Sequence, residues 1–228
     1  MTNQTDPTVV GIRFQKVGKI YHFDARNFRD LQTGDYAVVE TSRGKQLGEV
    51  VQLLDQPSRP PHGSWKPITR KATPRDLLLR QLWQRKALEA KITCRAKAAE
   101  LKLEGVKIIS AEYTFDGKRL SFLYSTETEE RVDLKSLKKA IQRTYKQSRV
   151  EMRQIGPRDV AKIIGGMGAC GMESQCCSIF LTEFSPISIK MAKEQGISLT
   201  PSEITGMCGR LRCCLIYEYQ QYINARKQ

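Results

Sequence analysis

The chain has 228 residues, of which 40% are apolar and 27% are charged, a composition that excludes intrinsically disordered and fibrous proteins. Its 38 Lys and Arg residues against 24 Asp and Glu give a formal net charge of +14, so its surface should attract nucleic acid or acidic protein faces. No run approaches the roughly eighteen apolar residues of a membrane-spanning helix, and Met1 to Asp6 are polar. These observations predict a cytoplasmic protein.

The N-terminal residues predict a β-rich domain over 7–56. Short apolar or alternating runs at 9–14, 19–23, 36–40 and 48–53 are separated by turn-forming glycines, which is typical of a small β-barrel or a curled sheet. Four of the nine prolines then fall within residues 56–67. This shift in composition predicts a linker over 57–72.

A long basic helix is expected to open the next domain, which is assigned to residues 73–165. Thr73, followed by Pro74 and with Asp76 three positions later, has the spacing of a capping box, and Gly105 is a suitable end. Apolar residues recur along the helix in an imperfect stripe, with the basic residues as its polar surface. The stripe consists of Leu78, Leu82, Leu88, Ile92, Ala99 and Leu103.

The basic residues of this helix form a candidate surface for nucleic acid or for a partner protein. Residues 57–104 hold twelve Lys and Arg against four Asp and Glu, a local charge of +8. A solvated helix face is the alternative interpretation of the same charge. The candidate residues are Arg75, Arg80, Arg85, Lys86, Lys91 and Arg95.

The elements that follow predict the fold of this domain. Asp116-Gly117, between two apolar runs, is a strong signal for a two-residue hairpin turn because both residues tolerate positive φ. Asp133 is expected to cap a second helix, and residues 150–155 to form a strand. Helix, hairpin, helix and strand in this order predict an α+β, split-βαβ-like sandwich. The whole chain is thus expected to be α+β.

The last segment, residues 166–228, is a duplicated cysteine-motif region with glycine loops. Each copy opens with Gly-x-Cys-Gly and ends in two adjacent cysteines. The three cysteines of the first copy recur in the second at offsets of 38, 37 and 37 residues. Without a signal peptide, such clustering is more typical of a metal or redox site than of disulfides. The candidate metal ligands are Cys170, Cys176, Cys177, Cys208, Cys213 and Cys214.

The cysteine pattern favours an iron-sulfur cluster over zinc. Thiolates are soft ligands, and the glycines leave room for backbone NH groups to approach cluster sulfurs. The spacing differs from the C-x₂-C pairs of zinc ribbons, so structural zinc ranks second. Two other interpretations remain open: small buried residues without a metal, and redox-active dithiols whose pKa values Arg210 and Arg212 would lower. Neighbouring side chains diverge, so one member of each adjacent pair can ligate while the other packs or serves a partner's site.

Catalysis has little support in the sequence. His22 and His62 are the only imidazoles, and both are far from the cysteines in the chain. A Ser/His/Asp or Cys/His arrangement is therefore poorly supported, and no dinucleotide-binding fingerprint is present. We expect a protein that is not an enzyme.

Several runs of the sequence carry a family resemblance that covers nearly the whole chain. They include GIRF at 11–14, GKIY at 18–21, RQIGPRD at 153–159, SIKMAK at 188–193 and GMCGRLRCC at 206–214. In these runs the sequence resembles the YaaT/RicT family of bacterial proteins, which are labelled stage 0 sporulation or polymerase-suppressor C-terminal domain proteins. Two departures lie in the first cysteine copy, where Met172 replaces the usual arginine and five residues instead of four separate Cys170 from Cys176.

The resemblance implies a function. Family members act as the T subunit of a complex with two small helical proteins, YlbF and YmcA, and this complex binds oxygen-sensitive 4Fe-4S clusters. It guides the endoribonuclease RNase Y in messenger RNA processing and affects sporulation. The resemblance implies that several of the six cysteines supply cluster ligands and that cysteines of the other subunits complete some of the sites. It also implies that the protein is a non-catalytic regulatory adaptor. The alternative is a stand-alone nucleic-acid-binding module with structural zinc.

Overall fold

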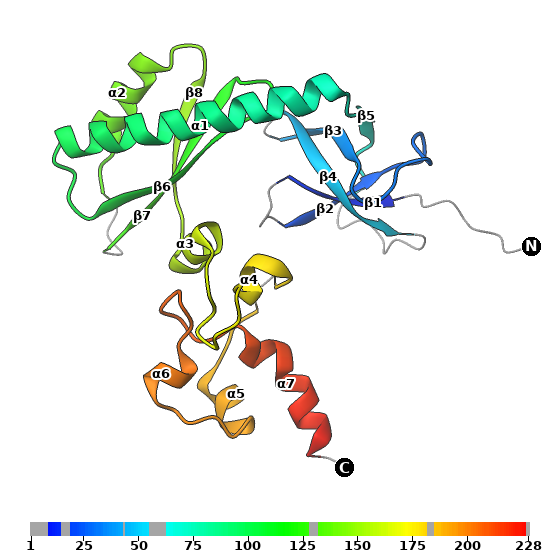
Figure 1. Ribbon diagram of the computed structural model, residues 1–228, viewed down its shortest axis with the longest axis vertical. Helices are drawn as coiled ribbons and strands as arrows, with labels where there is room; N and C mark the ends of the chain where they lie inside the picture. The colour runs from blue at the N-terminus through cyan, green and yellow to red at the C-terminus, as the bar shows by residue number, and fades with distance from the viewer. Residues whose placement is uncertain are drawn as a thin grey trace, which may run out of the picture. The chain divides into compact units, whose positions relative to one another are not determined.

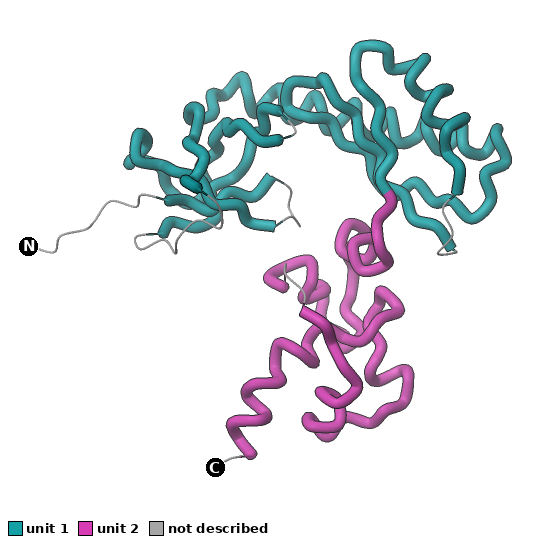
Figure 2. The backbone as a smooth tube through the Cα atoms, turned by 180° about the vertical axis from the view of Figure 1, so that it is seen from behind, with its two compact units in different colours: residues 1–153 teal, residues 154–228 magenta. Residues whose placement is uncertain are grey.

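The structure is a computed structural model that describes residues 9–14, 19–42, 44–54, 63–127, 132–181 and 185–226. The chain divides into two compact units, residues 1–153 and 154–228 (Figure 2). The predicted β-rich domain and most of the predicted 73–165 domain therefore lie in the first unit, and the predicted boundary at 165 lies inside the second. The expected α+β class is confirmed.

The first sheet of unit 1 is antiparallel and has the strand order β2-β1-β4-β3-β5 (Figure 1). Alternating apolar residues of its strands point into one core, in which Val10, Ile12, Val39 and Val50 are fully buried. The strands are β1 (Val9–Arg13), β2 (Ile20–Asp24), β3 (Tyr36–Thr41), β4 (Gly44–Leu54) and β5 (Ile68–Lys71).

This sheet curls so that its two ends approach each other. Asp24, at the end of β2, forms a bridge with Pro67, just before β5, and the Asp24 amide donates to the Lys66 carbonyl at 2.9 Å. The ring of His22 meets that of Trp65 edge-on, with 5.4 Å between ring centres. The expectation of a curled sheet is thus confirmed, although the described residues do not close a barrel.

The predicted linker over 57–72 is wrong at its C-terminal end. Residues 68–71 form β5, which pairs with β3, and Ile68 is buried in the core of the sheet. The strand escaped prediction because it is only four residues long and follows a proline-rich run. Residues 55–62 lie outside the described part of the chain.

Unit 1 also contains a three-stranded sheet with the strand order β6-β7-β8, which shares a second core with two helices (Figure 1). Phe122 and Leu120 of the sheet pack with Leu137 and Ile141 of the second helix, and all four are fully buried. The elements are α1 (Pro74–Glu100), β6 (Val106–Tyr113), β7 (Arg119–Thr126), α2 (Lys135–Thr144) and β8 (Arg149–Gln154). These are the helix, hairpin, helix and strand expected from the sequence.

The N-terminus of α1 is a reciprocal capping box, as predicted. The Asp76 carboxylate accepts hydrogen bonds from the Thr73 amide and hydroxyl, both at 2.8 Å, and the Thr73 hydroxyl accepts one from the Asp76 amide. Asp76 also forms a two-pronged ion pair with Arg70. The hydrogen bonds from Arg70 hold the pKa of the buried Asp76 well below its ordinary value, against the opposing effect of burial.

Replacing Asp76 with Asn is expected to lower the free energy of unfolding by about 1 to 2 kcal/mol near neutral pH, because it removes the charged half of the cap and of the ion pair. The folded pKa is depressed, so this stabilisation is present above the ordinary carboxyl pKa and is lost as pH falls through the folded value. The difference in the free energy of unfolding between the wild type and the variant, measured in urea, should therefore narrow in acid. A difference unchanged by acid would contradict the role of the charged Asp76 carboxylate. Glu100→Gln, at the exposed end of α1, is the control with little expected effect.

The predicted packing face of α1 is wrong. The helix lies on the sheet through small residues, Ala87, Ala90, Cys94 and Ala98, all buried. Leu78, Leu82, Leu88 and Ile92 of the expected stripe are exposed on the opposite side of the helix. Leu103 lies beyond the end of the helix and packs against the core. Small side chains let the helix axis approach β6 closely, so they form the contact although larger apolar residues are present in the same helix.

The two predicted turn and cap signals after α1 differ slightly from expectation. The hairpin at Asp116-Gly117 is confirmed, but its turn is longer than the two residues expected. Residues 114–118 connect β6 to β7, the Gly117 amide donates to the Thr114 carbonyl at 2.9 Å, and of the two expected turn residues Gly117 alone has positive φ, +70°. Asp133 lies one residue before the N-cap of α2, which is Leu134, and its carboxylate accepts a hydrogen bond from the Lys135 amide at 2.9 Å. Asp133 therefore satisfies a first-turn amide, although from one position earlier than expected.

Unit 2 consists of short helices joined by glycine-containing loops (Figure 1). Ala192 and Leu215 are fully buried where α5 meets α7, and the side-chain amide of Gln195 donates to the Leu215 carbonyl at 2.5 Å. The helices of the described residues are α3 (Pro157–Ile164), α4 (Cys176–Ile179), α5 (Ile189–Glu194), α6 (Pro201–Ile204) and α7 (Cys214–Ala225). In the described ranges, no helix is long and apolar enough to cross a membrane.

Candidate metal centre

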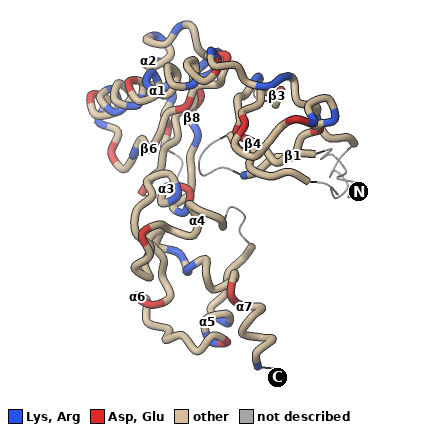
Figure 3. Tube along the Cα trace, turned by 45° about the vertical axis from the view of Figure 1, so that its right-hand side comes forward, with Lys and Arg blue, Asp and Glu red and all other residues tan. Residues whose placement is uncertain are grey.

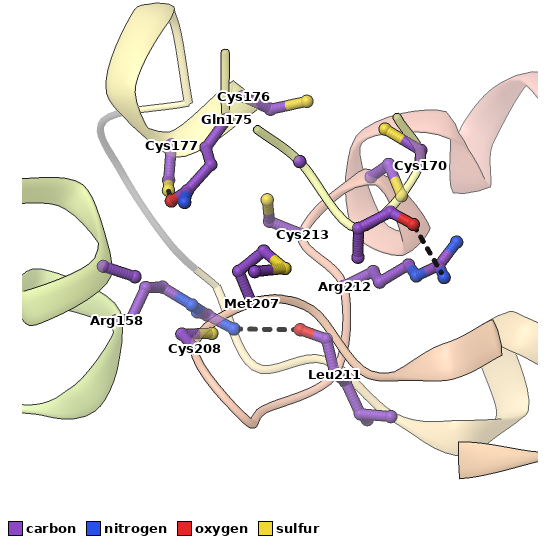
Figure 4. A pocket seen from close by; sticks show the side chains of 14 residues that line it. Arg158, Cys170, Gln175, Cys176, Cys177, Met207, Cys208, Leu211, Arg212 and Cys213 are labelled. Atoms are coloured by element: carbon purple, nitrogen blue, oxygen red, sulfur yellow. Dashed lines mark hydrogen bonds between the residues drawn. The ribbon is translucent and has the colours of Figure 1, made fainter. Parts of the chain in front are cut away.

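All six cysteines of the duplicated motif line one cavity in unit 2 (Figure 4). The cavity has a volume of about 60 Å³. A single water molecule occupies about 10 to 15 Å³ on the same measure, so the cavity can hold a larger group. It lies between the two glycine loops and the starts of α4 and α7. The cysteines are Cys170, Cys176, Cys177, Cys208, Cys213 and Cys214.

The two copies of the motif fold into the same turn. In the first, the Gly168 amide donates to the Met172 carbonyl at 2.8 Å, and in the second the Gly206 amide donates to the Arg210 carbonyl at the same distance. The second glycine of each copy has positive φ, +84° at Gly171 and +74° at Gly209. The internal repeat read from the sequence is therefore also a structural repeat.

Each adjacent cysteine pair lies where a helix starts. Cys176 is the first residue of α4, whereas Cys213 is the N-cap of α7 and Cys214 its first residue. In both copies the residue just before the pair accepts a hydrogen bond from the residue just after it: the Gln175 carbonyl from the Ser178 amide at 2.8 Å, and the Arg212 carbonyl from the Leu215 amide at 3.3 Å. The two copies also touch through their helices, since the rings of Phe180 and Tyr217 meet edge-on at 5.0 Å.

Two arginines connect the walls of the cavity. Arg158 of α3 donates to the Leu211 carbonyl at 3.2 Å. Arg212 donates to the Ala169 carbonyl of the first copy at 3.5 Å and to the Ser202 carbonyl at 2.9 Å (Figure 4). Both guanidinium groups thereby place positive charge beside the thiols, which favours an anionic group in the cavity.

Burial raises the pKa of three thiols of the cavity, those of Cys177, Cys213 and Cys214. Burial, together with a smaller effect of the neighbouring Cys177, Cys176 and Cys214, raises the pKa of Cys213 to about 11. Burial also raises the pKa of Cys214, with a smaller lowering contribution from Arg212. The expected lowering of thiol pKa values by Arg210 and Arg212 is therefore wrong for Cys214, because burial outweighs the charge. This weakens the interpretation of the cysteines as reactive dithiols.

The sulfur arrangement differs from that of a single-ion site. All seven cysteines are free thiols. In the part of the chain that the structure describes, no three Cys, His, Asp or Glu side chains are grouped closely enough for one metal ion. Four thiolates about 2.3 Å from one zinc ion would lie within roughly 4 Å of one another. A cluster of several irons and sulfides is a larger group, and its ligands surround it at greater separation.

The seventh cysteine lies apart from the cavity. Cys94 is fully buried in α1, and burial raises its pKa to about 11. Cys170, in contrast, is exposed at the cavity.

In metal-free protein at mildly alkaline pH, iodoacetamide is expected to label Cys170 at least about tenfold faster than Cys94, because only an accessible thiolate reacts. Peptide mass spectrometry of a labelling time course measures both rates. In urea the two rates should converge. Equal labelling of the two residues in the folded protein would show that Cys94 is not sealed in the core.

The predicted basic surface of α1 is only partly available. The Arg80 guanidinium lies 4.8 Å from the centre of the Tyr36 ring, and the Lys86 ammonium lies 4.8 Å from that of Trp83. Arg95 donates two hydrogen bonds to the Ile108 carbonyl. These three residues support the fold of unit 1. Arg75 and Arg85 are exposed on α1, and Lys91 is half-buried, with its pKa lowered by burial.

Sequence reasoning missed several residues that line the cavity. Arg158, Gln175 and Met207 contribute to its wall together with the cysteines. Gln175 accepts a hydrogen bond from the Cys177 thiol at 3.5 Å and donates to the Gly165 carbonyl. Arg158 and Met207 lie in the RQIGPRD and GMCGRLRCC runs, whereas Gln175 lies in none of the quoted runs.

Two regions of the chain match a known domain class. Residues 66–155, from just before β5 to the end of β8, match the PSP1 C-terminal conserved region. Residues 186–228, which contain α5, α6 and α7, match the third domain of PSP1-like proteins. The molecule is therefore a PSP1-domain protein.

Over 223 residues the chain is 42% identical to the protein named Stage 0 sporulation protein YaaT of Bacillus subtilis (strain 168), and the match spans 96% of this chain and 78% of that protein. The chain belongs to the YaaT family, as its motifs indicated. No solved structure matches the chain significantly.

Proposed function

We propose that this protein is a non-catalytic regulatory subunit that binds an iron-sulfur cluster, of the 4Fe-4S type, in its cysteine-lined cavity. With small helical partners of the YlbF and YmcA kinds, it would direct an endoribonuclease of the RNase Y type in messenger RNA processing. The observation that carries the proposal is the convergence of all six motif cysteines on one cavity. The name of its B. subtilis relative supports a role connected with sporulation.

The residues of the cavity fit such a cluster. The candidate donors are soft thiols, which iron-sulfur clusters require, and positive φ at Gly171 and Gly209 lets the loops turn tightly beside them. Arg158 and Arg212 offset the negative charge of thiolates and sulfide. When bound, the cluster supplies an oxygen-sensitive link between the two copies of the motif.

The exposed position of Cys170 supports a site that another subunit completes. A thiol at the rim can ligate a group shared with a partner, whereas the buried Cys177 cannot be reached from outside. Assembly would then depend on iron and be sensitive to oxygen, since metal binding is coupled to association.

Co-expression with YlbF-like and YmcA-like proteins tests the proposal. Purified without oxygen, the three chains are expected to elute as one complex that contains iron and sulfide. Exposure to air should remove the iron and dissociate the complex, as measured by size-exclusion chromatography with light scattering. A complex that forms equally well without iron would contradict the proposed role of the cluster in assembly.

A further inference from the structure

The outer face of α1 carries a row of large aliphatic residues in contact with solvent, and the exposed Arg85 and Glu89 lie on the same face. The exposed fractions of its side chains are 66% for Leu78, 45% for Leu82, 60% for Leu88 and 62% for Ile92. Single exposed leucines are common, but a row of large aliphatic residues on one element is typical of an interaction site. We call these four residues the outer stripe.

Helical geometry places the outer stripe on the side opposite the sheet. At 3.6 residues per turn, its members lie within about 120° of one another and face away from Ala90 and Cys94, which pack on the sheet. The stripe extends for about 21 Å along the axis, at about 1.5 Å per residue. That length matches about four turns of a second helix.

Charge identifies the chemistry of the occupant. Arg85 is exposed at the midpoint of the outer stripe, and the exposed Glu89 follows one turn later on the same face. The nearby basic residues Arg80 and Lys86 lie on aromatic rings of unit 1. Figure 3 shows that Lys and Arg recur along α1 and α2. An apolar helix with a carboxylate at its centre would satisfy Arg85 and cover the leucines at the same time.

The same residue disfavours a second copy of this chain. Because Arg85 lies midway between Leu78 and Ile92, two copies paired so that all four stripe residues overlap, parallel or antiparallel, would place one Arg85 against the other. Setting Arg85 against Glu89 of a second copy would require a pairing shifted along the helix, which reduces the overlap of the stripe. Like charges at the centre of an apolar interface are destabilising. A chain with a formal charge of +14 adds further repulsion between copies.

Nucleic acid fits this face less well than protein. Phosphates are bound by Lys and Arg, and unpaired bases by aromatic rings, but four exposed aliphatic side chains offer neither. The tryptophan of α1, Trp83, is stacked on Tyr113 with ring centres 4.9 Å apart, so it is not available to bases.

We infer that the outer stripe and Arg85 form a docking surface for an amphipathic helix of another protein, one with aliphatic residues along one face and a carboxylate at its centre. This surface belongs to unit 1 and is separate from the cysteine cavity of unit 2. The inference adds a partner-binding surface to the proposed function and does not depend on a bound cluster.

Binding of designed peptides to the full chain tests the inference. The probe is a fluorescent helical peptide of about 20 residues with a leucine face and a central Glu, and its companion carries Lys at that position. Fluorescence anisotropy is expected to show saturable binding of the Glu peptide and at least about tenfold weaker binding of the Lys peptide. Arg85→Glu should reverse this preference, whereas Lys139→Glu, the same charge change on the exposed face of α2, should not.

A double variant, Leu88→Gln with Ile92→Gln, tests the apolar part of the surface. It should weaken binding of the Glu peptide at least about tenfold. It should leave thermal unfolding unchanged, because both side chains are exposed. If the double variant unfolds, the reversal of peptide preference by Arg85→Glu tests the inference by itself.

Three results would overturn the inference. The first is no saturable binding of the Glu peptide. The second is self-association of the chain that Leu88→Gln with Ile92→Gln abolishes, which would identify a second copy as the occupant. The third is binding of a single-stranded RNA of about 20 nucleotides that Arg85→Glu weakens while neither peptide binds. Each of these can occur whether or not the cysteine cavity holds a cluster, so the two proposals are tested separately.

Discussion

Replacing Cys208, Cys213 and Cys214 together with serine is expected to reduce the iron and acid-labile sulfide of anaerobically purified protein to background. These three residues supply the second motif copy and half of the cysteines around the cavity. A hydroxyl is a hard, weakly acidic donor and does not replace a thiolate toward iron in a cluster. Metal and sulfide analysis of the purified protein gives the result directly.

The matched control for this variant is Cys94→Ala. It removes a cysteine sulfur from the core of unit 1, away from the cavity, and should leave the iron content unchanged. A far-UV circular dichroism spectrum checks that unit 1 folds in both variants. Iron retained by the triple variant, or lost from Cys94→Ala, would show that the cavity is not the binding site.

Gly117→Ala is expected to destabilise unit 1 by about 2 to 5 kcal/mol, the sum of a backbone and a steric cost. The φ of +70° at Gly117 disfavours any side chain, and a Cβ there would lie 2.4 Å from the Trp83 ring. Trp83 cannot move away without breaking its 2.9 Å hydrogen bond to the Phe115 carbonyl and its stacking on Tyr113.

Gly105→Ala separates the two costs. Gly105 has nearly the same φ, +72°, but a Cβ there would meet nothing within 4 Å. Gly105→Ala should lower the free energy of unfolding by only about 1 to 2 kcal/mol, the cost of the left-handed backbone. Urea unfolding followed by tryptophan fluorescence measures both variants. Equal losses at the two positions would mean that Trp83 does not constrain the hairpin.

The features of unit 1 that could be predicted from sequence are those set by nearby residues. The capping box of Thr73 and Asp76 and the Asp116-Gly117 turn depend on contacts within a few positions, and both are present in the structure. The four expected strands of the first sheet also form, because alternation of apolar residues is a local signal.

The face that α1 buries could not be predicted in the same way. Its large apolar residues suggest one packing face and its alanines another, and both have helical spacing. Only the distance between the helix and β6, which tertiary packing sets, favours Ala90 and Cys94 over Leu88 and Ile92.

The candidate site was predicted in its cysteines but not in its surroundings. The repeat of Gly-x-Cys-Gly and paired cysteines identified all six thiols that line the cavity. Gln175 and Met207 carry no chemical signature of their own, so their positions follow only from the folded loops. Arg158 reaches the cavity from α3, before the repeat begins, through a contact with Leu211 that sequence spacing does not reveal.

The most direct test of this account is the metal content of the wild-type chain purified without oxygen. Iron, zinc and acid-labile sulfide are measured together with the visible absorption spectrum, before and after exposure to air. We expect iron with sulfide and a visible band that air bleaches. Stoichiometric zinc, or protein without metal both alone and with its helical partners, would contradict the proposed cluster and leave a nucleic-acid-binding module as the better account.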